Sequence, residues 1–207
     1  LIAPWHVNGV LKGWQARYID MNGSGNCDNM YMCPRSLCNH QWVHQHDIKP
    51  KLCPICGYDD DPPRKVVKWY TCPGARTGDT FFNWEHAQAW PFLVLVEGPN
   101  DVFKMGTPVR SCERGPVIAS FNHVLTNEQK LLLFSRRQHQ AIVLMYDQDV
   151  WLNTLKLADE LKGTFPLGVY PIELPEDTDP GDLKHVDNWN LIRHTDGLKR
   201  FFDFSIA

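Results

Sequence analysis

Residues 91–98 read PFLVLVEG, an apolar run that ends in Glu97 and Gly98. A run this short and this apolar is typical of a strand that is buried on both faces of a sheet. Three similar runs follow it, namely PVIAS (116–120), AIVLMY (141–146) and VYPIEL (169–174). The four runs together predict the strands of one mostly parallel sheet.

The segments between these runs carry helix patterns. They are NDVFKM (100–105), TNEQKLLLFSRRQ (126–138) and DQDVWLNTLKLADELKG (147–163). Thr126 and Gln129 have the spacing of a capping box, and Gly163 is placed to end the last helix. In that last segment, apolar residues recur at helical spacing, at Trp151, Leu155, Ala158 and Leu161. Strands that alternate with helices in this way predict βαβ units, and therefore an α/β fold.

Length and charge limit the possible functions. With 207 residues, 43% of them hydrophobic, the chain can bury one core of ordinary domain size and carry a smaller module. Residues 1–90 hold nine Lys and Arg against eight Asp and Glu, whereas residues 91–207 hold twelve against sixteen. Binding to nucleic acid would therefore use local patches or metal-bridged phosphates rather than bulk positive charge.

No segment has the pattern of a membrane anchor. The longest apolar run, residues 91–96, is too short to cross a bilayer, and the first ten residues lack the pattern of a signal peptide. We therefore expect a soluble, cytoplasmic protein that binds no membrane.

Four of the seven cysteines fall within 24 residues, as the pairs Cys33 with Cys38 and Cys53 with Cys56. Two turns that each present a pair of thiolates can complete the tetrahedron of a structural Zn²⁺ site, so the clustering favours metal over disulfides. The first pair is separated by four residues where two are usual. The alternatives to Cys38 as a ligand are Cys27, His40, His44 and His46.

A closed site of four cysteines leaves no open coordination position, so its role is to fold a small module rather than to catalyse. Contact with nucleic acid is a possible additional role, through Arg35, Trp42, Lys49 and Lys51. Cys72 and Cys112 lie outside the cluster and are expected to be ordinary thiols.

Acidic residues follow the predicted strands. They are Glu97 and Asp101 after the first run, Asp147 and Asp149 after the third, and Asp177, Asp179 and Asp182 after the fourth. In an open parallel sheet the carboxyl ends of the strands meet at one edge, where ligands bind. Carboxylates that converge there repel one another unless a cation lies among them, and Mg²⁺ prefers such oxygen ligands.

Four stretches in order resemble the TOPRIM domain of DNA primases of the bacterial and phage type. LVLVEGPNDVFKM (93–105) resembles its first motif, and YDQD (146–149) resembles its Asp-x-Asp motif. SFNHVLTNEQKLLL (120–133) resembles the turn and helix between these motifs, and DTDPGDL (177–183) resembles the acidic Asp-Pro segment after the last strand. Val150 and Trp151 stand where the family often has Gly and Ala, which suggests a divergent member of phage type.

Two N-terminal stretches resemble segments that precede TOPRIM in such primases. GWQAR (13–17) is similar to a Gly-aromatic-x-x-Arg segment, and KWY (68–70) with the following residues is similar to a Lys-Tyr-x-x-x-Pro segment. The match implies that Arg17 and Lys68 contact nucleotide or template.

The resemblance also implies a domain organisation. Residues 91–190 are expected to form a TOPRIM-like α/β domain, a mostly parallel sheet flanked by helices. Residues 1–90 are expected to form a small α+β subdomain of primase type, with the zinc ribbon inserted at about residues 27–60. Residues 191–207 are expected to be a C-terminal tail or helix.

The activity that the resemblance implies is synthesis of short RNA primers on single-stranded DNA from ribonucleoside triphosphates, in a bacterium or a phage-infected cell. A replicative helicase is a candidate partner. Asp147, Asp149 and Asp179 would hold one or two Mg²⁺ or Mn²⁺ ions, Glu97 would be a further ligand or the base, and Asp101 would orient the site. For Asn100 and Lys104 the sequence indicates no role beyond their helix, and His123 and His139 are expected to be structural or exposed rather than catalytic.

Two other functions fit parts of the same sequence. A TOPRIM nuclease would keep the metal site but cut phosphodiesters, and it would not need Arg17 and Lys68 to place a nucleotide. A non-catalytic replisome module would bind nucleic acid through the zinc ribbon, with the acidic residues as relics.

Overall fold

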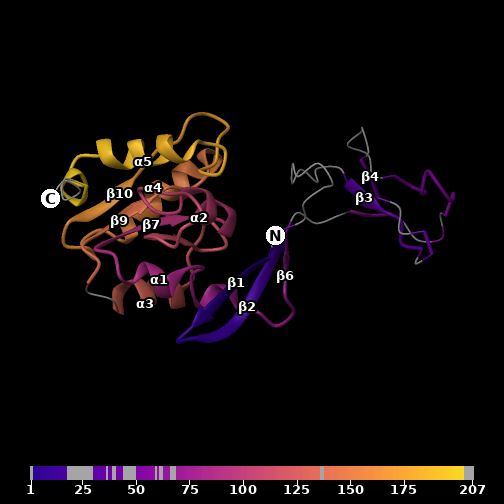
Figure 1. Ribbon diagram of the computed structural model, residues 1–207, viewed down its shortest axis with the longest axis horizontal. Coiled ribbons are helices and arrows are strands. Elements are labelled where there is room, and N and C mark those ends of the chain that lie inside the picture. The colour runs from indigo at the N-terminus through magenta and orange to yellow at the C-terminus, as the bar shows by residue number, and fades with distance from the viewer. Residues whose placement is uncertain are drawn as a thin grey trace. The chain divides into compact units, whose positions relative to one another are not determined.

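The computed structural model describes residues 2–17, 30–35, 37–38, 41–43, 50–58, 60, 63–65, 69–135 and 138–202. The chain divides into two compact units (Figure 1). The first unit consists of Leu1–Ala3 and Trp14–Pro73, and the second consists of Pro4–Gly13 and Gly74–Ala207.

The second unit is built on a four-stranded sheet. Its strands are β7 (Phe92–Val96), β8 (Val117–Ala119), β9 (Ala141–Leu144) and β10 (Gly168–Pro171). They lie in the order β10-β9-β7-β8, and every neighbouring pair is parallel. All residues of β7, β8 and β9 are buried, as expected for apolar strands that are covered on both faces. The predicted parallel α/β sheet is confirmed.

Helices cover both faces of this sheet. They are α1 (Trp84–Ala87), α2 (Pro99–Met105), α3 (Asn127–Ser135), α4 (Trp151–Glu160) and α5 (His185–His194). Three short 3₁₀ turns accompany them, η1 (Thr77–Asp79), η2 (Gln148–Val150) and η3 (Lys199–Phe201). In Figure 1, α5 lies on one side of the sheet and α1 and α3 lie on the other. None of the helices in the described part of the chain is long and apolar enough to span a membrane.

Alternate residues of the strands point to the two layers. Leu93 and Leu95 of β7 belong to a buried cluster with apolar side chains of α1, α3 and α4. Phe92, on the opposite face of β7, packs against Phe201 with ring centroids 5.1 Å apart. On that face Trp189 of α5 is buried, and its Nε1 donates to the Met105 carbonyl of α2 at 2.7 Å.

The predicted capping box at the start of α3 is present. The Gln129 backbone amide donates to Thr126 Oγ1, and the Thr126 amide donates to Gln129 Oε1, both at 3.1 Å. The side-chain Nε2 of the buried Gln129 also donates to the carbonyls of Thr80 and Ser120, at 2.8 and 3.0 Å. The cap therefore also fixes the segment around η1 beside the end of β8.

Two small sheets lie toward the N-terminus. The first has the order β1-β2-β6, formed by β1 (Ile2–Val7), β2 (Val10–Arg17) and β6 (Trp69–Thr71), with β2 and β6 antiparallel. Asn8 and Gly9, with φ of 53° and 74°, form the tight turn between β1 and β2. The second has the order β4-β3-β5, formed by β3 (Met30–Met32), β4 (Gln41–Val43) and β5 (Arg64–Lys65), and it is antiparallel.

Candidate metal sites

In the first unit, two turns carry the four clustered cysteines. Cys33 directly follows β3, and the amide of Cys38 donates to the Arg35 carbonyl at 3.0 Å. The second turn holds Cys53 and Cys56, and it is closed by the Gly57 amide, which donates to the Cys53 carbonyl at 2.9 Å. Gly57 has a φ of 66°, which glycine adopts at little cost.

The four sulfur atoms have the spacing of a tetrahedral metal site. They all lie within 4.8 Å of one another, with Cys33 Sγ 3.7 Å from Cys56 Sγ and Cys38 Sγ 3.9 Å from Cys53 Sγ. A tetrahedron with Zn–S bonds of about 2.3 Å has S–S edges of about 3.8 Å. The donor set therefore fits Zn²⁺. Cys27, His40, His44 and His46 lie outside the described residues.

The surroundings of these thiols differ. Burial raises the pKa of Cys33 to about 12. Burial also opposes ionisation of Cys53, but hydrogen bonds from the Cys56 and Ile55 amides outweigh it and lower the pKa of Cys53 to about 7. A bound cation would favour the thiolate at all four positions. Cys72, by contrast, accepts a hydrogen bond from the Trp14 amide, and Cys112 is exposed.

The second candidate site lies at the carboxyl edge of the four-stranded sheet. The Gln148 amide donates to the Thr178 carbonyl at 3.1 Å, which brings the segment after β9 beside the segment after β10. A hollow of about 270 Å³ opens there. Its acidic lining residues are Asp147, Asp149, Asp177, Asp179 and Asp182. Three of the predicted metal ligands are thus brought together.

Glu97 and Asp101 lie at the adjacent end of β7. Glu97 directly follows the strand, and Asp101 is in the first turn of α2 with 6% of its surface exposed. Asp101 Oδ2 accepts a hydrogen bond from the Gly98 amide at 3.0 Å. Its other oxygen faces Gly181, where an added Cβ would lie 2.8 Å from both Asp101 Oδ1 and Asp179 Oδ1. Any larger residue at this position would require one of the two carboxylates to move.

Burial, together with the charges of neighbouring acids, raises the pKa of three acidic residues at this edge. Burial, followed by the Asp179 carboxylate, raises the pKa of Asp101 to about 8. Burial, followed by the charge of Glu97, raises the pKa of Asp147 to about 7. Burial also raises the pKa of Glu97, against the opposing effect of His123. This is the behaviour of carboxylates that share a site without a neutralising cation.

Two observations test whether Mg²⁺ or Mn²⁺ fits this edge. Asp147 Oδ1 and Asp179 Oδ1 are buried, and neither has a hydrogen-bond partner in the described part of the chain. Among the described residues, the four cysteines are the one group of potential metal ligands that lies so close together, so the carboxylates are spaced more widely. Hard oxygen donors with room for water between them suit Mg²⁺, which keeps several of its waters.

Several residues support this edge through contacts that no sequence motif indicates. Lys104 Nζ donates to the Gly181 carbonyl, and Asn188 Nδ2 donates to the Pro180 carbonyl at 2.7 Å. The hydroxyl groups of Tyr146 and Ser120 lie 2.9 Å apart beneath the ends of β9 and β8. Lys104 and Gly181 are separated by 77 residues, so no local sequence pattern indicates their contact.

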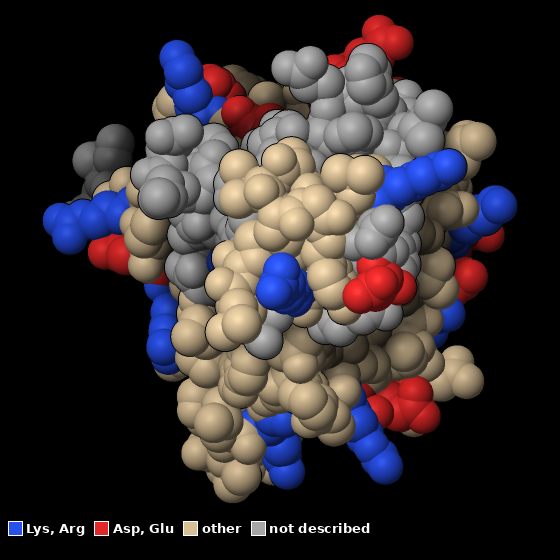
Figure 2. All heavy atoms as spheres, turned by 90° about the vertical axis from the view of Figure 1, so that its right-hand side faces the viewer, with Lys and Arg blue, Asp and Glu red and all other residues tan. Residues whose placement is uncertain are grey.

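The two predicted phosphate contacts belong to a different part of the chain. Arg17 is the last residue of β2, paired in register with Trp69 of β6. Lys68 lies outside the described residues. On the face drawn in Figure 2, the described Lys and Arg side chains lie singly, with Asp and Glu among them.

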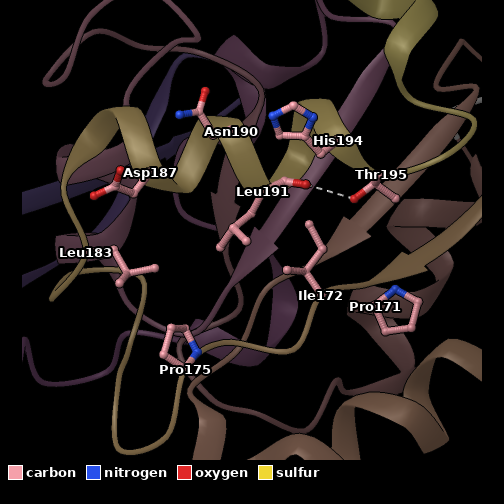
Figure 3. Close-up of a pocket in the computed structure, with 9 residues that line it drawn as sticks. All are labelled: Pro171, Ile172, Pro175, Leu183, Asp187, Asn190, Leu191, His194 and Thr195. Carbon is pink, nitrogen blue, oxygen red and sulfur yellow. Dashed lines mark hydrogen bonds between the residues drawn. The ribbon is translucent and has the colours of Figure 1, made fainter.

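A larger hollow of about 600 Å³ lies between the end of β10 and α5 (Figure 3). Ile172, Leu183 and Leu191 point toward its centre, and Thr195 Oγ1 donates to the Leu191 carbonyl at 3.0 Å on its rim. Asp187 is the one carboxylate in its lining. This hollow therefore lacks the converging acids of the sheet edge.

No protein-family model matches the chain, and no curated protein matches it. Among solved structures, it is similar to the zinc-binding and RNA polymerase domains of the Aquifex aeolicus primase, with a TM-score of 0.54 and 18% identity over 94% of this chain. It covers 37% of that chain. At this identity the likeness concerns the fold alone.

Two further similar structures are also primases. The primase fragment of the bacteriophage T7 primase-helicase protein gives a TM-score of 0.42 at 18% identity, covering 99% of this chain and 66% of that one. The DnaG primase catalytic domain bound to ssDNA gives 0.44 at 19%, covering 67% and 42%. By its similarity to the Aquifex aeolicus primase domains, the fold of this chain is primase-like, with a parallel four-stranded sheet and a four-cysteine cluster consistent with a zinc ribbon.

Proposed function

We propose that this chain is the core of a DNA primase that makes short RNA on single-stranded DNA from ribonucleoside triphosphates. The observation that carries the proposal is the convergence of Asp147 and Asp179 in one hollow, each with a buried oxygen atom that lacks a partner among the described residues. They come from two different strand ends, as expected for a ligand site at the edge of a parallel sheet. The primase-like fold supports the proposal.

In this proposal, Asp147, Asp149 and Asp179 hold one or two Mg²⁺ or Mn²⁺ ions. When bound, the metal neutralises the triphosphate and the developing negative charge of the leaving group. Glu97 is a further ligand or accepts the proton of the attacking hydroxyl, for which its raised pKa is suited. Asp101 orients the site by capping α2 through the Gly98 amide.

The proposal gives the basic residues and the cysteines separate roles. Arg17 and Lys68 would contact phosphates of nucleotide or template through charge-assisted hydrogen bonds. The four clustered cysteines would hold a structural Zn²⁺ that folds the first unit. A closed thiolate site supplies no catalysis, so the zinc would act only through the shape of that unit.

The test is an incubation of the purified chain with single-stranded DNA, labelled ribonucleotides and Mg²⁺ or Mn²⁺, with products resolved on a gel. The variant is Asp147→Asn with Asp149→Asn, and Asp187→Asn, an exposed carboxylate on α5, is the control. Short RNA from the parent and the control, absent from the double variant, supports the proposal. Shortened template without RNA would indicate the nuclease instead. No product of either kind would favour a binding module.

A further inference from the structure

The turn that carries Asp179 is held by three contacts to its backbone. The carbonyls of Thr178, Pro180 and Gly181 accept hydrogen bonds from Gln148 N, Asn188 Nδ2 and Lys104 Nζ, respectively. These donors come from three separate elements, η2, α5 and α2. We call residues 177–182 the acidic turn. It is fixed from three directions by groups that contact its main chain.

The Asp179 side chain has no comparable anchor. Its Oδ1 lacks a hydrogen-bond partner among the described residues, although it is buried. Across Gly181 it faces Asp101 Oδ1, and a Cβ added at residue 181 would lie 2.8 Å from both oxygen atoms. The two hydrogen bonds between Asp179 and Asp182 use main-chain atoms of Asp179: its carbonyl accepts from the Asp182 amide at 3.1 Å, and its amide donates to Asp182 Oδ2 at 3.4 Å. The position of this carboxylate must therefore be set by the backbone of the acidic turn.

The two side-chain donors are placed to do this. Asn188 is fully buried, and its Oδ1 has no hydrogen-bond partner in the described structure. The hydrogen bond from its Nδ2 to the Pro180 carbonyl is therefore the contact that stabilises this polar side chain in the interior. Lys104 lies three residues after Asp101 on α2, a spacing that puts both on one helical face. The same helix thus presents one acid to the site and one donor to the acidic turn.

We propose that Lys104 and Asn188 are positioning residues that hold the acidic turn so that Asp179 stays beside Asp147. This inference rests on the proposed function, because it takes Asp179 to be a metal ligand. Neither residue touches the reacting atoms. Both act on the metal site through the carbonyls of Gly181 and Pro180.

The test measures metal affinity apart from activity. The variants are Lys104→Met and Asn188→Leu, which remove the donors and keep similar volumes, and Lys104→Arg, which restores a donor. Lys162→Met, at an exposed lysine just after α4, is the matched control. Mn²⁺ affinity is followed by electron paramagnetic resonance of the free ion, together with thermal unfolding and amide exchange of the acidic turn, residues 177–182.

We expect Lys104→Met and Asn188→Leu to raise the Kd for Mn²⁺ about tenfold or more, as for other supports of metal ligands. Amide exchange of the acidic turn should accelerate, and Lys104→Arg should recover part of the affinity. The Mg²⁺ concentration for half-maximal RNA synthesis should rise in parallel, with little change in kcat at saturating metal.

Unchanged Mn²⁺ affinity in Lys104→Met overturns the inference, even if the unfolding midpoint falls, since that pattern means a purely structural contact. Unchanged affinity in Asp179→Asn, or a parent chain that binds no Mn²⁺, also overturns it. If Asn188→Leu does not fold, Lys104→Met decides. A parent that binds Mn²⁺ but makes no RNA contradicts the proposed function alone, because the affinity comparison still holds.

Discussion

The cysteine cluster and the acidic edge both gather anionic side chains from separate segments, but the two regions close to different extents. The four cysteine sulfurs lie within 4.8 Å of one another, and Cys33 and Cys53 are fully buried. The acidic side chains line a hollow of about 270 Å³ instead. Four soft thiolates complete a tetrahedron, whereas spaced carboxylates leave positions for water and phosphate.

The two regions also differ in the structure that surrounds them. Around the cysteines, the described strands β3, β4 and β5 are only two or three residues long. The acidic edge belongs to a sheet in which all residues of β7, β8 and β9 are buried and those of β10 are partly buried. We therefore expect metal binding to fold the cysteine cluster, and to enable catalysis at the acidic edge without being needed for its fold. Each of the following experiments tests this difference.

The largest effect on stability should come from Cys53→Ser combined with Cys56→Ser. Binding of a structural zinc contributes apparent free energies of about 10 kcal/mol or more to folding. Amides of the first unit, such as that of Tyr31, should then exchange as in an unfolded chain, while amides of β7 stay protected. Cys112→Ser, which removes an exposed thiol outside the cluster, is the control. Preserved protection around Cys53 would contradict a zinc-dependent fold.

The double variant Asp147→Asn with Asp149→Asn should lose activity without losing stability, unlike the cysteine variant. RNA synthesis should fall to background, but the unfolding midpoint in metal-free buffer should stay the same or rise. The raised pKa of Asp147 means that the fold disfavours its charge, so a neutral amide removes a repulsion. A clear loss of stability would mean that the acids, like the cysteines, hold the fold together.

Gly181→Ala should disturb the acidic edge and leave the cysteine cluster unchanged. The new Cβ would lie 2.8 Å from Asp101 Oδ1 and from Asp179 Oδ1, and such overpacking costs about 1–3 kcal/mol. The metal concentration needed for activity should rise as well. Gly163→Ala is the control, because its φ of 81° strains an alanine while nothing lies within 4 Å of the added Cβ. It should lower stability and leave the metal requirement unchanged.

Without added Mg²⁺, stability of the second unit should fall as the pH rises. Asp101 and Asp147 have folded pKa values of about 8 and about 7, against 3.8 for an ordinary Asp, so the folded state binds more protons in this window. Their contribution is fully present below pH 3.8 and is lost as the pH rises through 7 to 8. Mg²⁺ should flatten the decline in urea unfolding between pH 5 and pH 8. An equal decline with Mg²⁺ would argue against metal at this edge.

The smallest effect should come from Tyr146→Phe, which removes the hydrogen bond between Tyr146 and Ser120 under the acidic edge. Loss of one such bond costs about 1 kcal/mol. Ser120 keeps its contact with the Val96 carbonyl at 3.2 Å, so the edge should hold its shape and RNA synthesis should be nearly unchanged. A large loss of activity in a folded variant would show that the acidic edge depends on the hydrogen bond between Tyr146 and Ser120.

The parts of the fold that the sequence predicts are those with local signals. The apolar run before Glu97 is β7, and Thr126 and Gln129 form the cap at α3. The buried face of α4 was less predictable. Leu155 is 40% exposed and Leu157 is 5% exposed, although both are apolar. Two apolar rows overlap on this helix, and periodicity alone does not say which row faces the sheet.

The candidate sites divide in the same way. The four cysteines and the acids after each strand are visible as residue types at regular positions. Asn188 and Lys104 are not, because their partners are backbone carbonyls of the acidic turn, 8 and 77 residues away. Every residue has a backbone carbonyl, so a hydrogen bond to one does not require a particular residue type and cannot be predicted from the sequence pattern. Such supports are found only once the chain is folded.

The positions of the two clusters along the chain have a consequence for synthesis. The last cysteine of the cluster is residue 56, whereas Asp179 follows the last strand of the sheet. As a chain leaves the ribosome from its N-terminus, the thiolates are complete long before β9 and β10 can pair. A new chain can therefore take up its soft metal before any carboxylate edge exists to compete for a cation.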